Sequence, residues 1–219
     1  MTIVGNCRLI EDRFGNPDSA ILIELGGYAT IPSGIYFDPE TGGFTIMVWI
    51  KLLSLDYHKI IIDVALGRDK DNIWFGFPPS TTQPYFFINN NNNIVRFTNP
   101  TGIELYEWSH LTLAVNGDIA KLYIDGELSG LQTGIAYRKI ERTSNFIGGD
   151  NWGNRIHAVI DDLKIFNRGL DQSDIQSEMQ KLEPYEQINN NTPITTINST
   201  ITTTIATTNA PITGNLFIC

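Results

Sequence analysis

The chain has 219 residues, a formal net charge of −9, and 42% hydrophobic and 11% aromatic residues, which is enough for a substantial core. Lys and Arg form no cluster, so the positive footprint that binds phosphate backbones or anionic membranes is missing. We therefore expect no nucleic acid and no membrane among the partners, and no apolar run is long enough for a membrane span.

The start of the chain and its cysteines say little about the compartment. Residues 1–6 lack the basic start and apolar centre of a signal peptide, which indicates either an intracellular chain or a fragment of a longer one. Cys7 and Cys219 lie near opposite ends of the chain. They form neither a disulfide framework nor a zinc-binding spacing, and their fate is left open.

Alternating apolar residues predict a series of β-strands in the first hundred residues. These strands are expected at residues 20–25, 28–31, 44–50, 59–65, 73–77, 85–88 and 94–97. In residues 44–50 both faces are apolar, because Met47 and Trp49 alternate with the other apolar side chains. This pattern predicts a central strand that is covered on both sides.

Residues 107–126 read as one long antiparallel hairpin with a tight loop at Asn116, Gly117 and Asp118. Asp125 and Gly126 form a second turn that leads into another strand, and residues 156–166 predict a late strand. A hairpin alone is marginally stable in water, so these strands need partners elsewhere in the chain.

A single short helix is predicted after the last strand. Asp171 is placed as the N-cap, Asp174 as the acidic residue of the first turn, and Leu170 can pack against Ile175. About ten strands and one helix indicate an all-β fold, a two-sheet antiparallel sandwich or jelly roll, with the helix at a sheet edge.

The composition changes near residue 185, which divides the chain into a sandwich domain at residues 1–184 and a disordered Thr- and Asn-rich linker or stalk at residues 185–219. Asn190 and Asn198 match the N-glycosylation pattern. Such triplets are frequent in a tract of this composition, so a glycosylated stalk and a plain linker both remain open.

Four stretches in the same order resemble the laminin G-like jelly rolls of the concanavalin A-like lectin, glucanase and pentraxin superfamily. They are residues 27–32, 44–50, 107–126 and 147–168, and the resemblance covers residues 7–183. The resemblance implies a non-catalytic module that binds a glycan or an extracellular protein, often with a calcium ion at a sheet edge. It also implies an extracellular or secreted location, as part of a larger chain.

The resemblance directs attention to the polar loop that holds Asp12 and Asn16, because in similar proteins this loop lies near an acidic residue of the closing strand. That residue would be Asp161 or Asp162. Calcium prefers oxygen ligands, so the hypothesis is a calcium site formed by Asp12, Asn16 and Asp161. The alternative is that the loop carboxylates only cap turns.

A glycan site is predicted at the loop of Asp150, Asn151, Trp152 and Asn154. Sugar sites often combine an aromatic ring, which stacks on the apolar face of a pyranose, with planar polar groups for the hydroxyls. Trp152 would be the ring, whereas Trp49, Trp74 and Trp108 lie in or beside strands and are predicted to be core residues.

No catalytic residues are predicted. Retaining glucanases of this fold need two nearby carboxylates on one strand, whereas Glu104 and Glu107 are three positions apart. We therefore predict a recognition module rather than an enzyme. A glycoside hydrolase or lyase on the same scaffold, and a ligand-free spacer of a larger adhesive protein, are the alternatives.

Overall fold

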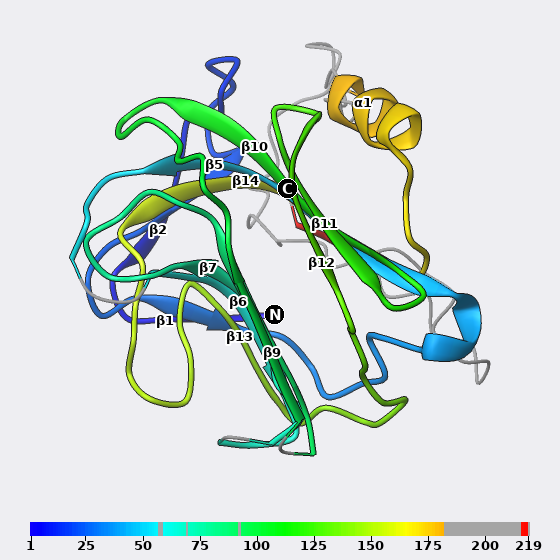
Figure 1. Ribbon diagram of the computed structural model, residues 1–219. Helices are drawn as coiled ribbons and strands as arrows, with labels where there is room; N and C mark the ends of the chain where they lie inside the picture. Colours follow the sequence, from blue (N-terminus) through cyan, green and yellow to red (C-terminus); the bar gives the residue numbers. More distant parts are fainter. Residues whose placement is uncertain (57–58, 69, 92, 182–215, 219) are drawn as a thin grey trace, which may run out of the picture.

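The protein is a sandwich of two antiparallel β-sheets with one α-helix on its outside (Figure 1). The computed structural model describes residues 1–56, 59–68, 70–91, 93–181 and 216–218. Within these residues, the predicted all-β class, the two-sheet architecture and the single short helix are confirmed.

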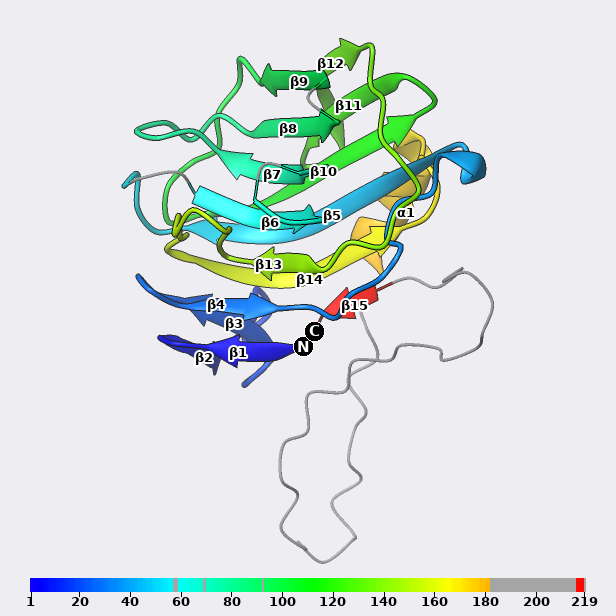
Figure 2. The same ribbon diagram turned by 90° about the horizontal axis from the view of Figure 1, so that it is seen from below.

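The first sheet has seven strands, which lie side by side in Figure 2. Their order across the sheet is β1 (Thr2–Val4), β4 (Tyr28–Thr30), β13 (Ser144–Ile147), β6 (Lys59–Ala65), β7 (Ile73–Phe77), β8 (Tyr85–Asn90) and β9 (Asn93–Thr98). The strands β6 to β9 follow one another in the chain, whereas β1, β4 and β13 come from distant parts of the sequence.

The second sheet has eight strands. Their order is β12 (Glu127–Thr133), β11 (Ile119–Ile124), β10 (Trp108–Asn116), β5 (Gly43–Leu52), β14 (Ala158–Phe166), β3 (Ala20–Ile23) and β2 (Cys7–Ile10), with β15 (Leu216–Ile218) also paired to β14. A short 3-10 helix, η1 (Pro39–Thr41), precedes β5 and is capped by the side chain of Asp38.

The core lies between the sheets, and β5 runs through its centre. Phe44, Ile46 and Val48 of β5 point into the core and are fully buried. Burial of one such side chain contributes roughly 1.5–3 kcal/mol to stability. On the other face of β5, Met47 is buried in a second apolar cluster outside the sandwich. The prediction that this strand is covered on both sides is therefore confirmed.

The long hairpin forms as predicted, with a loop one residue shorter. Asn116 of β10 pairs with Ile119 of β11, which leaves Gly117 and Asp118 as the loop. Gly117 has a φ of 58°, in the left-handed region that favours glycine.

The helix α1 (Gln172–Gln180) begins where the sequence predicts. Asp171 accepts a hydrogen bond from the backbone N–H of Asp174 (2.8 Å), as an N-cap does. Leu170 and Ile175 share the cluster of Met47 and the neighbouring strands, so α1 covers a face of the eight-stranded sheet and not the predicted edge. No helix among the described residues has the length and apolar character needed to cross a membrane.

Four strands have no counterpart among the predicted ones, namely β1, β2, β13 and β15. Each has only three or four residues, so an alternating pattern gives a weak signal there. Within the predicted linker only β15 is described, and it pairs with Leu163–Ile165 of β14. Asn190 and Asn198 lie outside the described residues.

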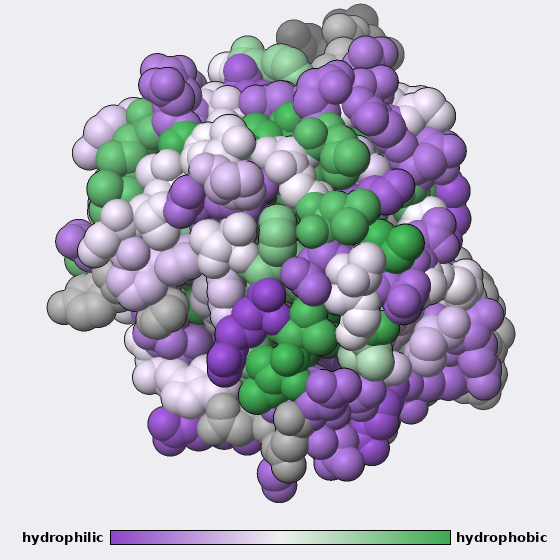
Figure 3. All heavy atoms as spheres, viewed as in Figure 1, coloured by the Kyte–Doolittle hydropathy of each residue, from purple (hydrophilic) through white to green (hydrophobic). Residues whose placement is uncertain are grey.

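The two sheets approach each other at β9 and β12. Asn99, which follows β9, donates a hydrogen bond to the hydroxyl of Ser129 in β12 (2.7 Å). Ile94, Leu128 and Leu131 are exposed here, and Figure 3 shows apolar groups among polar ones on this face.

Candidate functional site

Residues 150–154, between β13 and β14, form a turn around the carboxylate of Asp150. Its Oδ1 accepts hydrogen bonds from the backbone N–H groups of Trp152 (2.9 Å) and Asn154 (2.9 Å), and its Oδ2 accepts one from Asn154 Nδ2 (2.7 Å). Gly153 has a φ of 86°. Asp150 is only 2% exposed, and its carboxylate is used by these hydrogen bonds to hold the backbone of the segment. We call residues 150–154 the Trp152 turn.

The Trp152 side chain takes no part in the hydrogen bonds that hold this turn. Asn151 exchanges hydrogen bonds with the hydroxyl of Ser144 in β13 (2.7 and 2.9 Å). Trp152 is partly exposed, and the guanidinium carbon of Arg68 lies 5.9 Å from its ring centroid. The turn therefore presents a ring beside a cation. Ligand contacts by Asp150, Asn151, Trp152 and Asn154 remain predictions.

A row of side chains crosses the outer face of the seven-stranded sheet. Direct cross-strand pairing joins, in order, Thr30, Phe146, Asp63, Trp74, Phe87 and Arg96. Residues that alternate with them, such as Phe75, lie in the core, so this row faces away from the other sheet.

Two further rings flank this row. The Tyr85 ring lies 5.1 Å from that of Trp74, and the Tyr28 ring lies 5.7 Å from that of Phe146. We call Tyr28, Phe146, Trp74, Tyr85 and Phe87 the aromatic row. The sequence predicts that Trp74 is a core residue. It is buried, with 6% of its surface exposed, but it lies on the outer face of the sheet and not in the core between the sheets.

Asp63 is the carboxyl group within this row, and it is fully buried. Asn72 Nδ2 donates a hydrogen bond to its Oδ1 (3.0 Å). Burial raises the pKa of Asp63 to about 7; the Asn72 hydrogen bond opposes this shift, and the nearby Asp150 carboxylate adds to it. Near neutral pH a large share of this carboxyl group therefore carries no charge.

Arg155 joins the Trp152 turn to the aromatic row. Its guanidinium carbon lies 4.4 Å from the Tyr28 ring centroid, a distance typical of a cation–π contact. Its Nη1 donates hydrogen bonds to the backbone carbonyl oxygens of Asp150 (3.1 Å) and Asn154 (2.6 Å). The turn and the row therefore form one continuous surface.

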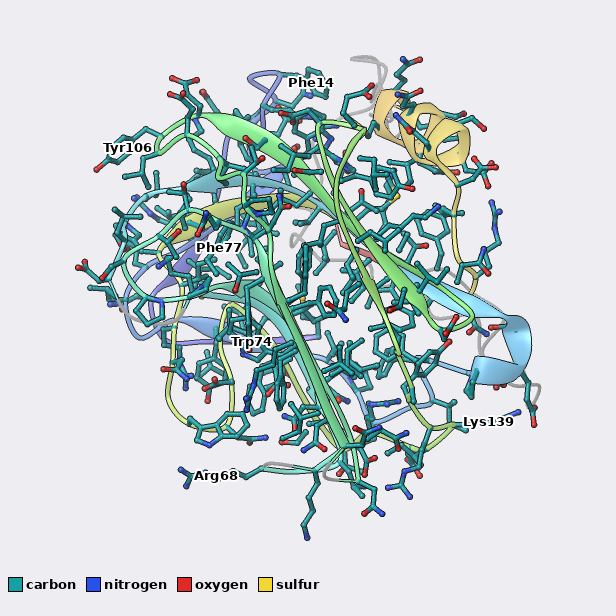
Figure 4. All side chains as sticks on the ribbon, viewed as in Figure 1. Phe14, Arg68, Trp74, Phe77, Tyr106 and Lys139 are labelled. Atoms are coloured by element: carbon teal, nitrogen blue, oxygen red, sulfur yellow. The ribbon has the colours of Figure 1, made fainter. Side chains whose placement is uncertain are left out.

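Asp12 and Asn16, the predicted calcium ligands, form a second turn of the same construction between β2 and β3. Asp12 Oδ1 accepts hydrogen bonds from the backbone N–H groups of Phe14 (2.8 Å) and Asn16 (2.9 Å), and Oδ2 accepts one from Asn16 Nδ2 (2.8 Å). Phe14 takes the place of Trp152 and is 58% exposed. This Phe14 turn lies at the opposite end of the molecule from Arg68 (Figure 4).

Arg13 of the Phe14 turn folds back onto β14. Its guanidinium pairs with the carboxylate of Asp161 and with that of Asp162 (2.6 Å). The guanidinium carbon also lies 4.3 Å from the Phe14 ring and 4.8 Å from the Trp49 ring. The Arg13 side chain is 7% exposed, so a buried cation of the chain itself lies against both carboxylates.

The predicted calcium ligands do not fit a calcium ion in this arrangement. Calcium takes six to eight oxygen ligands, but the oxygens of Asp12 hold the turn and Asp161 is paired with Arg13. The described residues contain no group of three or more His, Cys, Asp or Glu side chains placed to hold a metal. We therefore expect no calcium binding by these three residues, and a calcium titration tests this expectation.

The sequence alone did not identify the aromatic row or the role of Arg13. In β7 the apolar residues lie on both faces, so their spacing does not show that Trp74 faces outward. The pairing of Arg13 with Asp161 joins residues 148 positions apart. One signal was available, because Asp-x-aromatic-Gly-Asn occurs at residues 12–16 and again at residues 150–154.

Solved structures with the same fold include two proteins in complex with sugars. Domain 4 of AbnA, a GH43 extracellular arabinanase from Geobacillus stearothermophilus, in complex with arabinotriose, matches with a TM-score of 0.64 and 18% identity over 80% of this chain and 81% of that one. The botulinum neurotoxin serotype D ligand-binding domain in complex with N-acetylneuraminic acid matches with a TM-score of 0.57 and 18% identity. That match covers 81% of this chain but only 46% of the toxin domain.

A heptameric SAP-like pentraxin from Limulus polyphemus also matches, with a TM-score of 0.51 and 15% identity over 78% of this chain and 79% of that one. A comparison with curated proteins found no match. The model of the concanavalin A-like lectin/glucanases superfamily matches residues 24–176, which is more than half of the sequence. The chain therefore belongs to the concanavalin A-like lectin/glucanase superfamily.

Proposed function

We propose that the protein is a non-catalytic carbohydrate-recognition module that acts outside the cell. The observation that carries this proposal is the ring of Trp152, held on a preformed turn at the border of the aromatic row. A ring whose backbone is already held in place loses less conformational entropy when a sugar stacks on it. The sugar complexes of the arabinanase domain and of the toxin domain support a carbohydrate as the ligand.

The test is a glycan array probed with the full chain and with Trp152→Ala. Loss of the Trp152 ring is expected to weaken binding about tenfold or more, because aromatic contacts concentrate binding energy. Phe14→Ala is the matched control, since it removes a ring from the same type of turn on the other sheet. Equal loss in both variants, or no bound glycan, would contradict the proposal.

The non-catalytic part of the proposal has its own test. Purified protein is incubated with a panel of polysaccharides, and reducing ends and unsaturated products are measured. We expect no release above that of a buffer control, whereas turnover would favour the glycoside hydrolase or lyase alternative. An extracellular protein partner remains the other recognition hypothesis, and a chain that binds nothing would be a spacer.

A further inference from the structure

The charges on the surface formed by the Trp152 turn and the aromatic row are unlike the charge of the whole chain. The chain carries a formal net charge of −9, yet three arginines contact rings here. Arg68 lies over Trp152, Arg96 over Phe87 (5.3 Å) and Arg155 over Tyr28. Arg68 and Arg96 are exposed, and Arg155 is partly exposed.

The carboxylates near this surface do not neutralise these arginines. Among the described residues, no Asp or Glu forms an ion pair with any of the three. Asp150 is buried in its turn, and Asp63 is fully buried between Phe146 and Trp74. The charges of the three guanidinium groups are therefore not neutralised by a described carboxylate, although Arg155 has a nitrogen, Nη1, that is already bonded to backbone carbonyl oxygens.

The form of these cations favours a particular kind of partner. A guanidinium presents a planar fork of N–H donors that matches the two oxygens of a carboxylate or sulfate group. Each fork here lies beside an aromatic ring, and such a ring contacts the apolar face of a sugar. A ring and a fork together match a sugar unit that carries an acidic substituent.

The spacing along the row favours a chain of such units over a single one. Tyr28, whose ring Arg155 contacts, lies on β4 and Arg96 lies on β9, and five strand spacings separate these two strands across the sheet. At about 4.8 Å for each spacing, the distance from Tyr28 to Arg96 is about 24 Å. A ligand that contacts Arg155 at one end and Arg96 at the other must be extended.

We infer that the ligand of this surface is an acidic glycan chain, whose carboxylate or sulfate groups pair with Arg68, Arg96 and Arg155 while its sugar rings contact Trp152 and the partly exposed rings of the aromatic row. This inference rests on the proposed function and adds the chemical class of the sugar. The inference predicts that the surface prefers charged glycans over neutral ones, a preference that a surface for neutral glycans would not show.

The test uses glycans in matched pairs that differ only in charge. Suitable pairs are polygalacturonate and its methyl ester, heparin and its desulfated form, and a sialylated glycoprotein before and after sialidase treatment. Binding of the full chain is measured at several salt concentrations. We expect the charged member of at least one pair to bind about tenfold more tightly, with an affinity that falls as salt rises.

Variants locate the effect on the surface. Arg68→Gln combined with Arg96→Gln is expected to remove most of the preference for the charged member, because both side chains are exposed and neither forms an ion pair with a described carboxylate. Arg8→Gln is the control, since Arg8 is exposed on β2 of the other sheet, where it pairs with Glu24. The control is expected to bind within about twofold of the native chain.

The outcomes separate this inference from the proposed function. If both members of every pair bind equally, the ligand is a neutral glycan, and the inference fails while the proposed function stands. If charge selectivity persists in the double variant or is lost in Arg8→Gln, the binding surface is misplaced and the inference fails. If no glycan of either kind binds, the proposed function fails as well.

Discussion

Replacement of Arg13 by Met tests whether the pairing of Arg13 with Asp161 and Asp162 holds the Phe14 turn on the eight-stranded sheet. Methionine keeps an apolar stem between the Phe14 and Trp49 rings but removes the cation. Asp161 and Asp162 are then left buried without it, with side chains 4% and 10% exposed. Loss of one partner of a buried ion pair costs about 3 kcal/mol or more, so the free energy of unfolding should fall by at least that amount.

The effect should depend on pH in a defined direction. Burial raises the pKa of Asp161 to about 6, the Asp162 carboxylate adds to the shift, and Arg13 opposes it. Without Arg13 the native-state pKa rises further above the unfolded value. Because the native state then binds more protons than the unfolded state, the unfolding free energy of the variant falls as pH rises through this range. The deficit relative to the native chain should be smallest below about pH 4.

Urea denaturation at several pH values measures this effect, and Arg13→Met combined with Asp161→Asn and Asp162→Asn is the control. Removal of both carboxylates should restore part of the lost stability and flatten the pH dependence. A difference below about 1 kcal/mol between Arg13→Met and the native chain at neutral pH would refute the reasoning.

Four further measurements test other parts of the structure. Excess calcium or a chelator should leave the melting temperature of the native chain unchanged, and a clear shift would restore the predicted calcium site. Asp63→Asn should raise the free energy of unfolding above pH 7 by up to about 4 kcal/mol and reduce the loss of stability between about pH 4 and pH 7. The reason is that the raised pKa of Asp63 lets the native state hold a proton in that interval that the unfolded state has released. Denaturant titrations of the variant and the native chain at matched pH values measure this difference. Asp171→Ala should cost about 1 kcal/mol by loss of the N-cap, measured by thermal unfolding. Gly43→Ala should destabilise by about 2 kcal/mol or more, because a Cβ at Gly43 would lie 2.0 Å from the carbonyl oxygen of Val115; a variant with native stability would contradict this placement.

Local signals in the sequence predict those elements whose structure is determined locally. The Asn116-Gly117 pair is enough to place the hairpin loop, and Asp171 is enough to place the start of the helix. The apolar faces of residues 44–50 identify a central strand, because only a strand covered on both sides can bury Met47 as well as Val48.

The candidate site depends on pairing across strands, which local signals do not encode. Phe146, Trp74 and Phe87 come from three separate strands, and only the order of those strands brings them into one row. Arg155 follows Asn154 in the sequence, but its contact with Tyr28 requires β4 to lie beside β13. The sequence could therefore identify the Trp152 ring but not the surface that it borders.

The two Asp-x-aromatic-Gly-Asn turns show how the same local structure can serve two purposes. In each turn the aspartate binds the same three donors, so the sequence alone determines the backbone and the position of the ring. The residue after the aspartate differs. Arg13 reaches two carboxylates of the eight-stranded sheet, whereas Asn151 bonds to Ser144 and leaves the cation beside Trp152 to come from Arg68.

This difference explains why one turn is a candidate for ligand binding and the other is not. The cation of the Phe14 turn is buried and paired, so a ligand at Phe14 would meet a ring whose charged neighbour is already engaged. Arg68 beside Trp152 is exposed and has no described carboxylate partner, so its donors remain available. Phe14→Ala and Trp152→Ala each remove a ring from a turn of the same geometry, but only the Trp152 ring lies beside an available cation. A comparison of the two variants therefore shows how much that cation contributes to binding.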